Sequence, residues 1–354
     1  MTILITGAAG FIGSNLVERL LTTESSVQIV GLDSVNDYYD VSIKEYRLNR
    51  LRQIAAEYPN SYTFVKGNLA DKVLIDHLFA DYCFDVVVNL AAQAGVRYSI
   101  TNPDAYIESN LIGFYNILEA CRHSYDNGRD GVQHLVYASS SSVYGSNKKV
   151  PYSTDDKVDN PVSLYAATKK SNELMAHAYS KLYNIPSTGL RFFTVYGPAG
   201  RPDMAYFGFT NKLIKGETIQ IFNYGNCKRD FTYIDDIIEG VQRIIHGAPQ
   251  RKTGEDGLPI PPYKVYNIGN SNPTDLLDFV QILQEELVRA GVLPKDYDFA
   301  VHKQLVPMQA GDVPVTYADT SALECDFGFK PRTSIRDGLR KFAEWYRTFY
   351  LKEN

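Results

Sequence analysis

The stretch Thr6-Gly7-Ala8-Ala9-Gly10-Phe11-Ile12-Gly13 lies between an apolar segment, Thr2–Thr6, and a segment with helical periodicity, Gly13–Leu21. An apolar segment, a glycine-rich turn and a helix in this order are typical of the first unit of a doubly wound α/β sheet. The glycines let the backbone turn tightly and come close to a pyrophosphate, whose charge then lies at the helix N-terminus. The spacing is GxxGxxG rather than GxGxxG, and it predicts a dinucleotide site.

Asp33 supports this interpretation. It directly follows a second expected strand, Val27–Leu32. At this position an acidic side chain accepts hydrogen bonds from the adenosine ribose and repels a 2′-phosphate. The sequence therefore favours NAD over NADP as the cofactor.

Strands and helices alternate through the first half of the chain. Further strands are expected at Tyr62–Val65, Phe84–Leu90, His134–Ala138 and Ser187–Arg191, and helices at Ile43–Glu57, Lys72–Ala80, Pro103–Arg122 and Ser163–Tyr183. The run Phe84–Leu90 is almost continuously apolar, which is typical of a strand covered on both faces of a parallel sheet. This alternation predicts an α/β fold with a doubly wound parallel (Rossmann) sheet.

The alternation breaks after Val195. Residues 247–262 contain four prolines and three glycines, which predicts a surface loop, and an amphipathic helix is expected over Pro273–Ala290. We therefore predict an NAD-binding domain at 1–195, to which some later segments return. Residues 196–354 are expected to form mainly a smaller α/β lobe that binds the substrate.

Composition excludes several classes of protein. The chain has 354 residues, of which 44% are hydrophobic and 22% charged, with a net charge of −5. These values exclude a disordered chain, a collagen-like repeat and a coiled coil, and they provide no basic field for nucleic acid. Neither a signal sequence nor an apolar run long enough to span a membrane is visible, so we expect a cytoplasmic protein. One unusual number is the count of 26 tyrosines against one tryptophan.

The four cysteines are widely separated, at Cys83, Cys121, Cys227 and Cys325. They form no CxxC pair, and no histidine lies at a metal-ligating spacing. We expect reduced, mostly buried thiols and no metal site.

A second motif, Tyr165-Ala-Ala-Thr-Lys169, places a phenol and an ammonium group on one face of a helix. A nearby ammonium group and a cationic nicotinamide both favour the phenolate, which predicts a lowered pKa for Tyr165 and a role as a base. Ser139-Ser-Ser-Ser142 lies at the end of the expected strand His134–Ala138. Because ligands bind at the carboxyl ends of parallel strands, one of these hydroxyls is expected to share the hydrogen bond of a substrate hydroxyl with Tyr165.

Together these features resemble the extended short-chain dehydrogenase/reductase family, and the match to its nucleotide-sugar epimerase branch covers nearly the whole chain. Longer stretches are similar to UDP-glucuronate 4-epimerases. They are Asp37-Tyr-Tyr-Asp-Val-Ser42, Leu90-Ala-Ala-Gln-Ala-Gly-Val-Arg-Tyr-Ser99, Ser163-Leu-Tyr-Ala-Ala-Thr-Lys-Lys170, Leu190-Arg-Phe-Phe-Thr-Val-Tyr-Gly-Pro198, Gly200-Arg-Pro-Asp-Met-Ala205 and Lys228-Arg-Asp-Phe-Thr-Tyr-Ile-Asp-Asp236.

The resemblance implies NAD-dependent 4-epimerisation of UDP-glucuronate to UDP-galacturonate through a transient 4-keto sugar. The implied catalytic residues are Tyr165, Lys169, Ser140 and Ser142. The implied cofactor-binding residues are Gly7, Gly10, Phe11, Ile12, Gly13, Asp33, Asn68, Leu69, Leu90, Ala91, Ala92, Gln93, Asn110, Tyr165 and Lys169. The implied substrate-binding residues are Arg97, Ser141, Ser142, Thr194, Arg201, Arg229 and Asp312, with the arginines as partners of the diphosphate or the uronate.

Two departures from the family pattern stand out. Asn68 occupies a position near the adenine that usually carries Asp, and an amide can still bond adenine. Gln309 stands where galactose-type relatives have an arginine, three residues before Asp312, so the contacts to uridine differ. Alternatives remain within the branch: a UDP-glucose or UDP-N-acetylglucosamine 4-epimerase, or a UDP-glucuronate decarboxylase. Ser142 disfavours the decarboxylase, whose relatives carry an acidic residue at this position.

The resemblance also implies a homodimer built from two helices of each subunit. The two longest expected helices, Asp104–Cys121 and Leu164–Tyr183, are the candidates. A binding protein without turnover is disfavoured because both Tyr165 and Lys169 are present.

Overall fold

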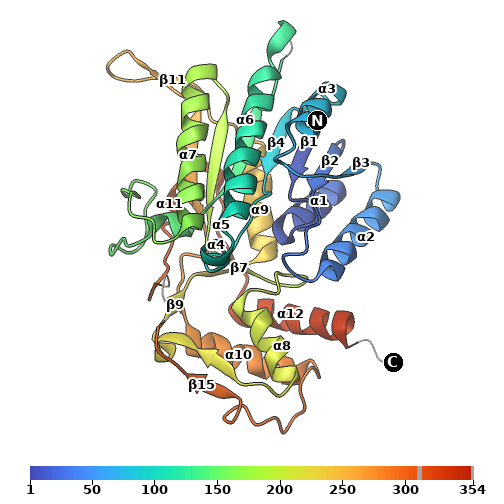
Figure 1. The fold of residues 1–354 in the computed structure, drawn as a ribbon, viewed down its shortest axis with the longest axis vertical. Coiled ribbons are helices and arrows are strands. Elements are labelled where there is room, and N and C mark those ends of the chain that lie inside the picture. Colours follow the sequence, from blue (N-terminus) through green and yellow to red (C-terminus); the bar gives the residue numbers. More distant parts are fainter. Residues whose placement is uncertain (129, 309–312, 352–354) are drawn as a thin grey trace.

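A parallel sheet of seven strands forms the centre of the computed structural model, which describes residues 1–128, 130–308 and 313–351 (Figure 1). The strands are β1 (Thr2–Thr6), β2 (Gln28–Asp33), β3 (Ser61–Lys66), β4 (Val86–Asn89), β5 (His134–Ser140), β6 (Ser187–Phe192) and β13 (Tyr263–Ile268). Their order is β13-β6-β5-β4-β1-β2-β3. The chain therefore builds outward from β1 to β3 and then returns to the other side of β1 at β4.

Both faces of the sheet are covered by helices (Figure 1). One layer contains α1 (Phe11–Thr23), α2 (Val41–Glu57) and α9 (Ile234–Ile245), and the other contains α3 (Lys72–Asp81), α6 (Gly113–His123) and α7 (Leu164–Tyr183). Successive side chains of β1 enter the two different cores: Ile3 and Ile5 pack in one, and Leu4 packs in the other. This burial on both faces explains the continuous apolar runs of the strands.

These observations confirm the predicted doubly wound sheet. Each predicted strand is present, with shifted ends; for example, the run Phe84–Leu90 forms a strand only at Val86–Asn89. The helix expected from Pro273 begins at Leu276 as α10 (Leu276–Arg289). Its expected first residues instead form β14 (Thr274–Asp275), which pairs with β9 (Lys228–Arg229).

The helix expected over Pro103–Arg122 is present, but it is not α-helical throughout. It consists of α5 (Pro103–Tyr106), a π-helical segment at Ile107–Ile112 and α6, and the short helix α4 (Tyr98–Thr101) precedes it. The wider π turn carries the buried side chain of Asn110. Such turns interrupt a helix without breaking it, and periodicity alone does not reveal them.

A smaller lobe lies beyond the carboxyl ends of the strands, in the lower part of Figure 1. It contains α8 (Ala205–Ile214), α10 and α12 (Ile335–Tyr350), and β8 (Ile219–Ile221) paired with β15 (Lys303–Leu305). Two later elements leave this lobe for the main sheet: β13 extends it at the edge, and α9 packs against α1. The predicted loop 247–262 is exposed and contains a small hairpin, β11 (Lys252–Thr253) with β12 (Pro259–Ile260).

The cysteine prediction is half right. All four thiols are free, but only Cys121 and Cys227 are buried, whereas Cys83 and Cys325 are exposed. Cys83 lies in the short loop between α3 and β4, and Cys325 lies in the short helix α11 (Ser321–Phe327). Within the described ranges, no group of His, Cys, Asp and Glu side chains is placed to hold a metal ion, and no helix is long and apolar enough to cross a membrane.

Candidate active site

A cavity of about 1100 Å³ lies at the carboxyl ends of the central strands, where residues of the sheet and of the smaller lobe meet. It opens next to β1, where the strand order reverses, which is the usual ligand position in open α/β sheets. Most of the residues predicted for the cofactor and substrate line it. They are Gly7, Gly10, Phe11, Ile12, Gly13, Asp33, Asn68, Leu69, Leu90, Ala91, Ala92, Gln93, Arg97, Ser140, Ser141, Ser142, Tyr165, Lys169, Thr194 and Arg201.

The glycine turn is shaped to receive a phosphate group. Gly7 has a φ of +73°, and a Cβ added there would lie 2.8 Å from the backbone nitrogen of Ala91. A Cβ at Gly13 would lie 2.1 Å from the carbonyl oxygen of Gly7. Helix α1 starts after Gly10, which has no side chain to cap the first N–H groups. These donors are left for a ligand, so the turn fits a pyrophosphate.

Asp33 holds the same turn from the end of β2. Its Oδ2 accepts a hydrogen bond from the N–H of Ala9 at 3.0 Å, and its Oδ1 accepts one from Val35 at 2.8 Å. A carboxylate oxygen accepts more than one hydrogen bond, so these contacts leave capacity for ribose hydroxyls. Nearby, the amide group of Asn68 donates to Glu108 at 2.8 Å and accepts from the N–H of Ala70 at 3.0 Å.

Asn110 is not among the cavity-lining residues, although the resemblance implies that it binds the cofactor. Its Oδ1 accepts from the N–H of Gln93 at 2.8 Å, and its Nδ2 donates to the carbonyl of Gln93 and to the hydroxyl of Thr168, both at 3.0 Å. The π turn directs this side chain between the loop after β4 and helix α7. Asn110 therefore fixes the backbone of Gln93 by two hydrogen bonds and does not itself line the cavity.

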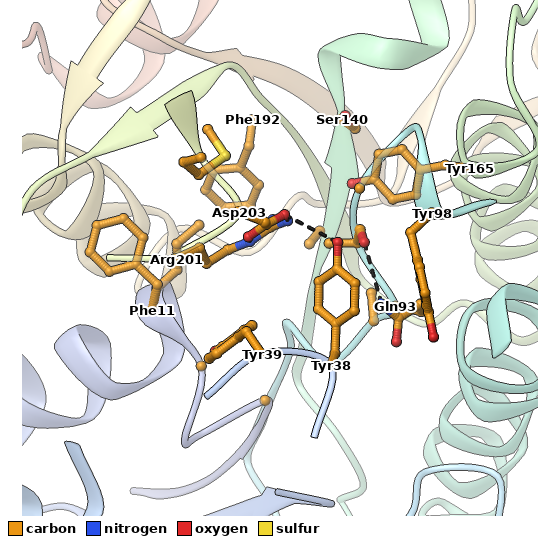
Figure 2. Close-up of a pocket in the computed structure, with 18 of the residues that line it drawn as sticks. Phe11, Tyr38, Tyr39, Gln93, Tyr98, Ser140, Tyr165, Phe192, Arg201 and Asp203 are labelled. Atoms are coloured by element: carbon orange, nitrogen blue, oxygen red, sulfur yellow. Dashed lines mark hydrogen bonds and ion pairs between the residues drawn. The ribbon is translucent and has the colours of Figure 1, made fainter. Parts of the chain in front are cut away.

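Helix α7 brings the second motif to the cavity. It begins after Ser163, whose hydroxyl accepts from the N–H of Ala166 at 3.1 Å, and its first turns carry Tyr165 and Lys169. Lys169 is 3% exposed, and its Nζ donates to the carbonyl of Ala138 at 2.8 Å. Figure 2 shows Tyr165 near Ser140, at the end of β5.

Only one of the strand-end serines acts on the Tyr165 phenol. Ser140 makes a side-chain hydrogen bond that lowers the pKa of Tyr165, and its hydroxyl also donates to Ser142 at 3.1 Å. Ser139 points away and donates to Glu173 at 2.7 Å. The structure thus separates hydroxyls that the sequence could not distinguish.

The ionisation of the pair differs from the expectation. Burial raises the pKa of Tyr165, and the hydrogen bond with Ser140 and the charge of Arg201 only partly oppose this rise. Burial also lowers the pKa of Lys169 to about 8. The prediction that Lys169 lowers the pKa of Tyr165 is therefore wrong for the protein's own residues, in which Ser140 and Arg201 favour the phenolate.

The residues predicted for the substrate are only partly brought together. Arg201 pairs with Asp203 inside the cavity, and Thr194 begins β7 (Thr194–Tyr196) in its wall. The guanidinium of Arg97 also lines the cavity and lies over the ring of Phe222, 5.4 Å from its centre. Arg97 and Arg201, the second of them paired with Asp203, thus bring two guanidinium groups to one cavity of an acidic protein.

Arg229 is absent from the described lining of the cavity. Because β9 pairs with β14, its Nη1 donates to the carbonyl oxygens of Lys228 and Pro314, at 3.1 and 3.0 Å. Its predicted role in binding the substrate has no support from this position. Asp312 and Gln309 lie outside the described residues.

The sequence did not single out several residues that line the cavity. Tyr38 and Asp203 meet there, and Tyr98 packs against Tyr38 (Figure 2). Tyr38 and Asp203 belong to stretches quoted above for their resemblance to epimerases. That signal marked the stretches but gave no individual role to either residue.

Comparisons with known proteins agree with this geometry. Residues 3–269 match the model of the "NAD dependent epimerase/dehydratase family". Protein CapI of Staphylococcus aureus is 50% identical over 99% of this chain and 100% of its own, and UDP-glucuronate 4-epimerase 4 of Arabidopsis thaliana is 44% identical over 99% of this chain and 76% of its own. A solved structure of UDP-glucuronic acid 4-epimerase from Bacillus cereus, in complex with UDP-glucuronic acid and NAD, superimposes with a TM-score of 0.81 at 31% identity, covering 99% of this chain and 100% of that one.

The chain belongs to the NAD dependent epimerase/dehydratase family.

For a member of the NAD dependent epimerase/dehydratase family, the cavity lining offers two kinds of chemistry. The glycine turn, Asp33 and the loop after β4 suit NAD. Arg97, Thr194 and Arg201 offer charged and polar groups to a substrate, and Tyr165 lies in the same cavity.

Proposed function

We propose that this protein is a UDP-glucuronate 4-epimerase, an isomerase that converts UDP-glucuronate to UDP-galacturonate. The observation that carries the proposal is the position of Arg201, which lines the same cavity as Tyr165 and pairs with Asp203 through only one edge of its guanidinium. In a hexuronate the carboxylate is attached to C5, the neighbour of the reacting C4. A cation beside the base for the C4 hydroxyl therefore suits a uronate more than a neutral sugar.

The glycine turn and Asp33 would hold NAD, which would supply the redox chemistry of the reaction as acceptor and later donor of the C4 hydride. Tyr165 takes the proton of the C4 hydroxyl while the C–O single bond becomes a carbonyl, and it gives the proton back when the keto group is reduced. Ser140 shares a hydrogen bond with the Tyr165 side chain, and this contact favours the phenolate form. Lys169 is placed on the same helical face as Tyr165 and supports the cofactor end of the cavity.

The reaction leaves the oxidation state of the sugar unchanged. Purified protein that retains its NAD is therefore expected to interconvert the two UDP-uronates with no added cofactor, and the conversion is followed by NMR of the sugar C4 proton. Tyr165→Phe removes the proton acceptor and should lower the rate by about 1000-fold. The exposed Tyr58 provides a matched control, as Tyr58→Phe should leave the rate unchanged.

Decarboxylation is the competing outcome, because a 4-keto uronate is a β-keto acid. Ser142 stands where the family resemblance implies an acidic residue in decarboxylases, and its hydroxyl accepts a hydrogen bond from Ser140. UDP-xylose and CO₂ as the only products would overturn the proposal. Conversion of UDP-glucose or UDP-N-acetylglucosamine with no conversion of UDP-glucuronate would instead favour an epimerase of neutral sugars.

The proposal includes the domain roles, the assembly and the location. Residues 1–195, with β13 and α9, bind NAD, and the rest of 196–354 binds mainly the UDP-sugar.

The protein is a cytoplasmic homodimer whose contact is formed by α6, α7 and the π-helical segment before α6. In support, exposed apolar side chains gather on these elements. They are Ile107, Ile112, Tyr115, Leu174, Leu182 and Tyr183.

A further inference from the structure

The segment Asp37-Tyr-Tyr-Asp-Val-Ser42 contributes to the cavity, yet the proposed reaction assigns it no role. It connects β2 to α2, and Tyr38 extends from it across the cavity (Figure 2). The hydroxyl of Tyr38 donates to Oδ2 of Asp203 at 3.2 Å. This hydrogen bond joins two loops that are 165 residues apart in sequence.

Asp203 in turn holds Arg201. Its Oδ1 accepts from Nε of Arg201 at 3.0 Å, and its Oδ2 accepts from Nη2 at 2.5 Å. Because this pairing uses one edge of the planar guanidinium, the edge formed by Nη1 and Nη2 remains able to take a second carboxylate. The orientation of that edge depends on Asp203, and Tyr38 fixes Asp203.

Tyr38 is itself held from the opposite side. Its ring packs against that of Tyr98, with centres 4.8 Å apart. A Cβ at Gly95 would lie 2.7 Å from the Tyr38 hydroxyl oxygen, and Gly95 has a φ of +102°. The loop after β4 therefore has a glycine where the Tyr38 hydroxyl needs space.

One buried guanidinium connects the two loops at their bases. Arg47 is 2% exposed and donates to the hydroxyl of Tyr39 at 2.9 Å and to the carbonyl of Ala9, in the glycine turn, at 2.9 Å. It also donates to the carbonyl of Ala199 at 2.7 and 3.0 Å and to that of Gly200 at 3.0 Å. The loop that carries Arg201 is thus fixed relative to the turn proposed to bind the cofactor phosphates.

We propose that Tyr38 is a positioning residue that acts through Asp203 to hold the free edge of Arg201 toward the sugar carboxylate, and thereby sets the preference for uronates over neutral hexoses. This inference rests on the proposed function, since it takes a UDP-hexuronate as the substrate. It assigns Tyr38 no contact with the reacting atoms. Removal of its hydroxyl therefore weakens the recognition of one charged group and leaves the rest of the nucleotide sugar bound as before.

The test compares Tyr38→Phe with the wild type on two ligands that differ at C6. The dissociation constants of UDP-glucuronate and UDP-glucose are measured by calorimetry on the NAD-containing protein, together with kcat and KM for UDP-glucuronate. Loss of a hydrogen bond to a charged group is expected to weaken UDP-glucuronate binding by about tenfold and to leave UDP-glucose within about twofold. KM should rise more than kcat falls.

A double-mutant cycle identifies the route of the effect. If Tyr38 acts through Arg201, then Tyr38→Phe has no further effect on UDP-glucuronate binding in an Arg201→Gln background. Tyr58→Phe is the matched control, and thermal unfolding reports whether each variant is folded. Equal losses for both ligands, additive effects in the cycle or unchanged binding would each overturn the inference.

The same measurements separate this inference from the proposed function. A wild-type protein that neither binds nor epimerises UDP-glucuronate contradicts the proposed function, and the inference falls with it. A wild-type epimerase whose Tyr38→Phe variant keeps its preference for the uronate contradicts the inference alone.

Discussion

Arg191 and Glu173 form a two-pronged ion pair in the protein interior, with Nε to Oε1 at 2.8 Å and Nη2 to Oε2 at 2.9 Å, and each side chain is only 3% exposed. Arg191 lies on β6, and Glu173 lies on α7, one turn after Lys169. Ser139 completes the group by donating to Glu173. The pair therefore fixes the helix that carries Tyr165 against the strands that carry the serines.

Glu173→Gln should strongly destabilise the protein, because it leaves the buried Arg191 charge uncompensated. The expected loss in the free energy of unfolding is about 3–5 kcal/mol, measured by urea denaturation at pH 7. The exposed Glu217 provides a control, since Glu217→Gln should change this free energy by less than about 0.5 kcal/mol. A loss below about 1 kcal/mol for Glu173→Gln would contradict the assigned role.

The same pair predicts a dependence on pH. Burial raises the pKa of Glu173, but Arg191 and Ser139 outweigh burial and lower it below the ordinary value of 4.5. The unfolded state then binds more protons in acid. The stabilisation is complete above pH 4.5 and is lost as the pH falls through the lowered pKa of the folded state. The difference between wild type and Glu173→Gln should therefore shrink in that acidic window.

Ser140, rather than Ser141, should be the serine that the reaction needs. Ser140→Ala removes a hydrogen bond to Tyr165 and is expected to lower kcat about 100-fold, whereas Ser141→Ala should lower it less than tenfold. Initial rates of UDP-glucuronate conversion give both values. Equal losses in the two variants would show that the hydrogen bond between Ser140 and Tyr165 is not the one that matters.

Lys169 should be needed for activity but harmful to stability. It is 3% exposed, its ammonium group donates to one carbonyl at 2.8 Å, and burial lowers its pKa to about 8. A buried lysine with a lowered pKa disfavours the folded state at neutral pH, and this cost disappears as the pH rises from 8 toward 10.5. Lys169→Met should therefore raise the free energy of unfolding of the NAD-free protein by about 2 kcal/mol at pH 7.

Activity should change in the opposite direction, with Lys169→Met losing at least about 100-fold in kcat. Thermal unfolding of NAD-free protein and a rate assay on the same sample make the comparison. The interpretation fails if the variant is less stable than the wild type at pH 7 or keeps its full rate.

Asp33→Asn should shift the choice of cofactor. The substitution keeps a side-chain oxygen for the N–H of Ala9 or Val35, and it removes the charge that repels a 2′-phosphate. We expect about tenfold weaker binding of NAD and an NADP affinity that is closer to that of NAD, measured by fluorescence titration. Asp81→Asn, at an exposed position at the end of α3, is the control.

The fold was predictable because its signals are local. The glycine turn and Asp33 belong to the first strand–turn–helix unit and the strand that follows it. Tyr165 and Lys169 lie four residues apart on one helix, so its periodicity alone brings them together. The high tyrosine count was noted from the composition, and the structure explains the use of some of these tyrosines as core residues. Five tyrosines are among the largest fully buried side chains: Tyr106, Tyr137, Tyr144, Tyr196 and Tyr206.

What the sequence missed depends on contacts between distant segments. Tyr38 and Asp203 meet only because the sheet places their loops at one edge. Arg229 is directed toward backbone carbonyls by the pairing of β9 with β14, and Asn110 is directed inward by a π turn. None of these directions follows from residue type or spacing. The effect of burial on the pKa of Tyr165 was missed for the same reason, because burial is a property of the assembled fold.

Leu174 tests the proposed dimer. It is 60% exposed on α7, in the group of apolar side chains that the homodimer would cover. Leu174→Asp introduces a charge that dimerisation would bury without a partner, so the dissociation constant of the dimer should rise by at least about 100-fold. Val301, 64% exposed in the smaller lobe, is an equally exposed apolar residue outside this group. Val301→Asp should leave the dimer intact. Sedimentation velocity over a range of protein concentrations distinguishes the variants. The assigned contact is contradicted if the wild type sediments as a monomer or if the Leu174→Asp variant remains a dimer.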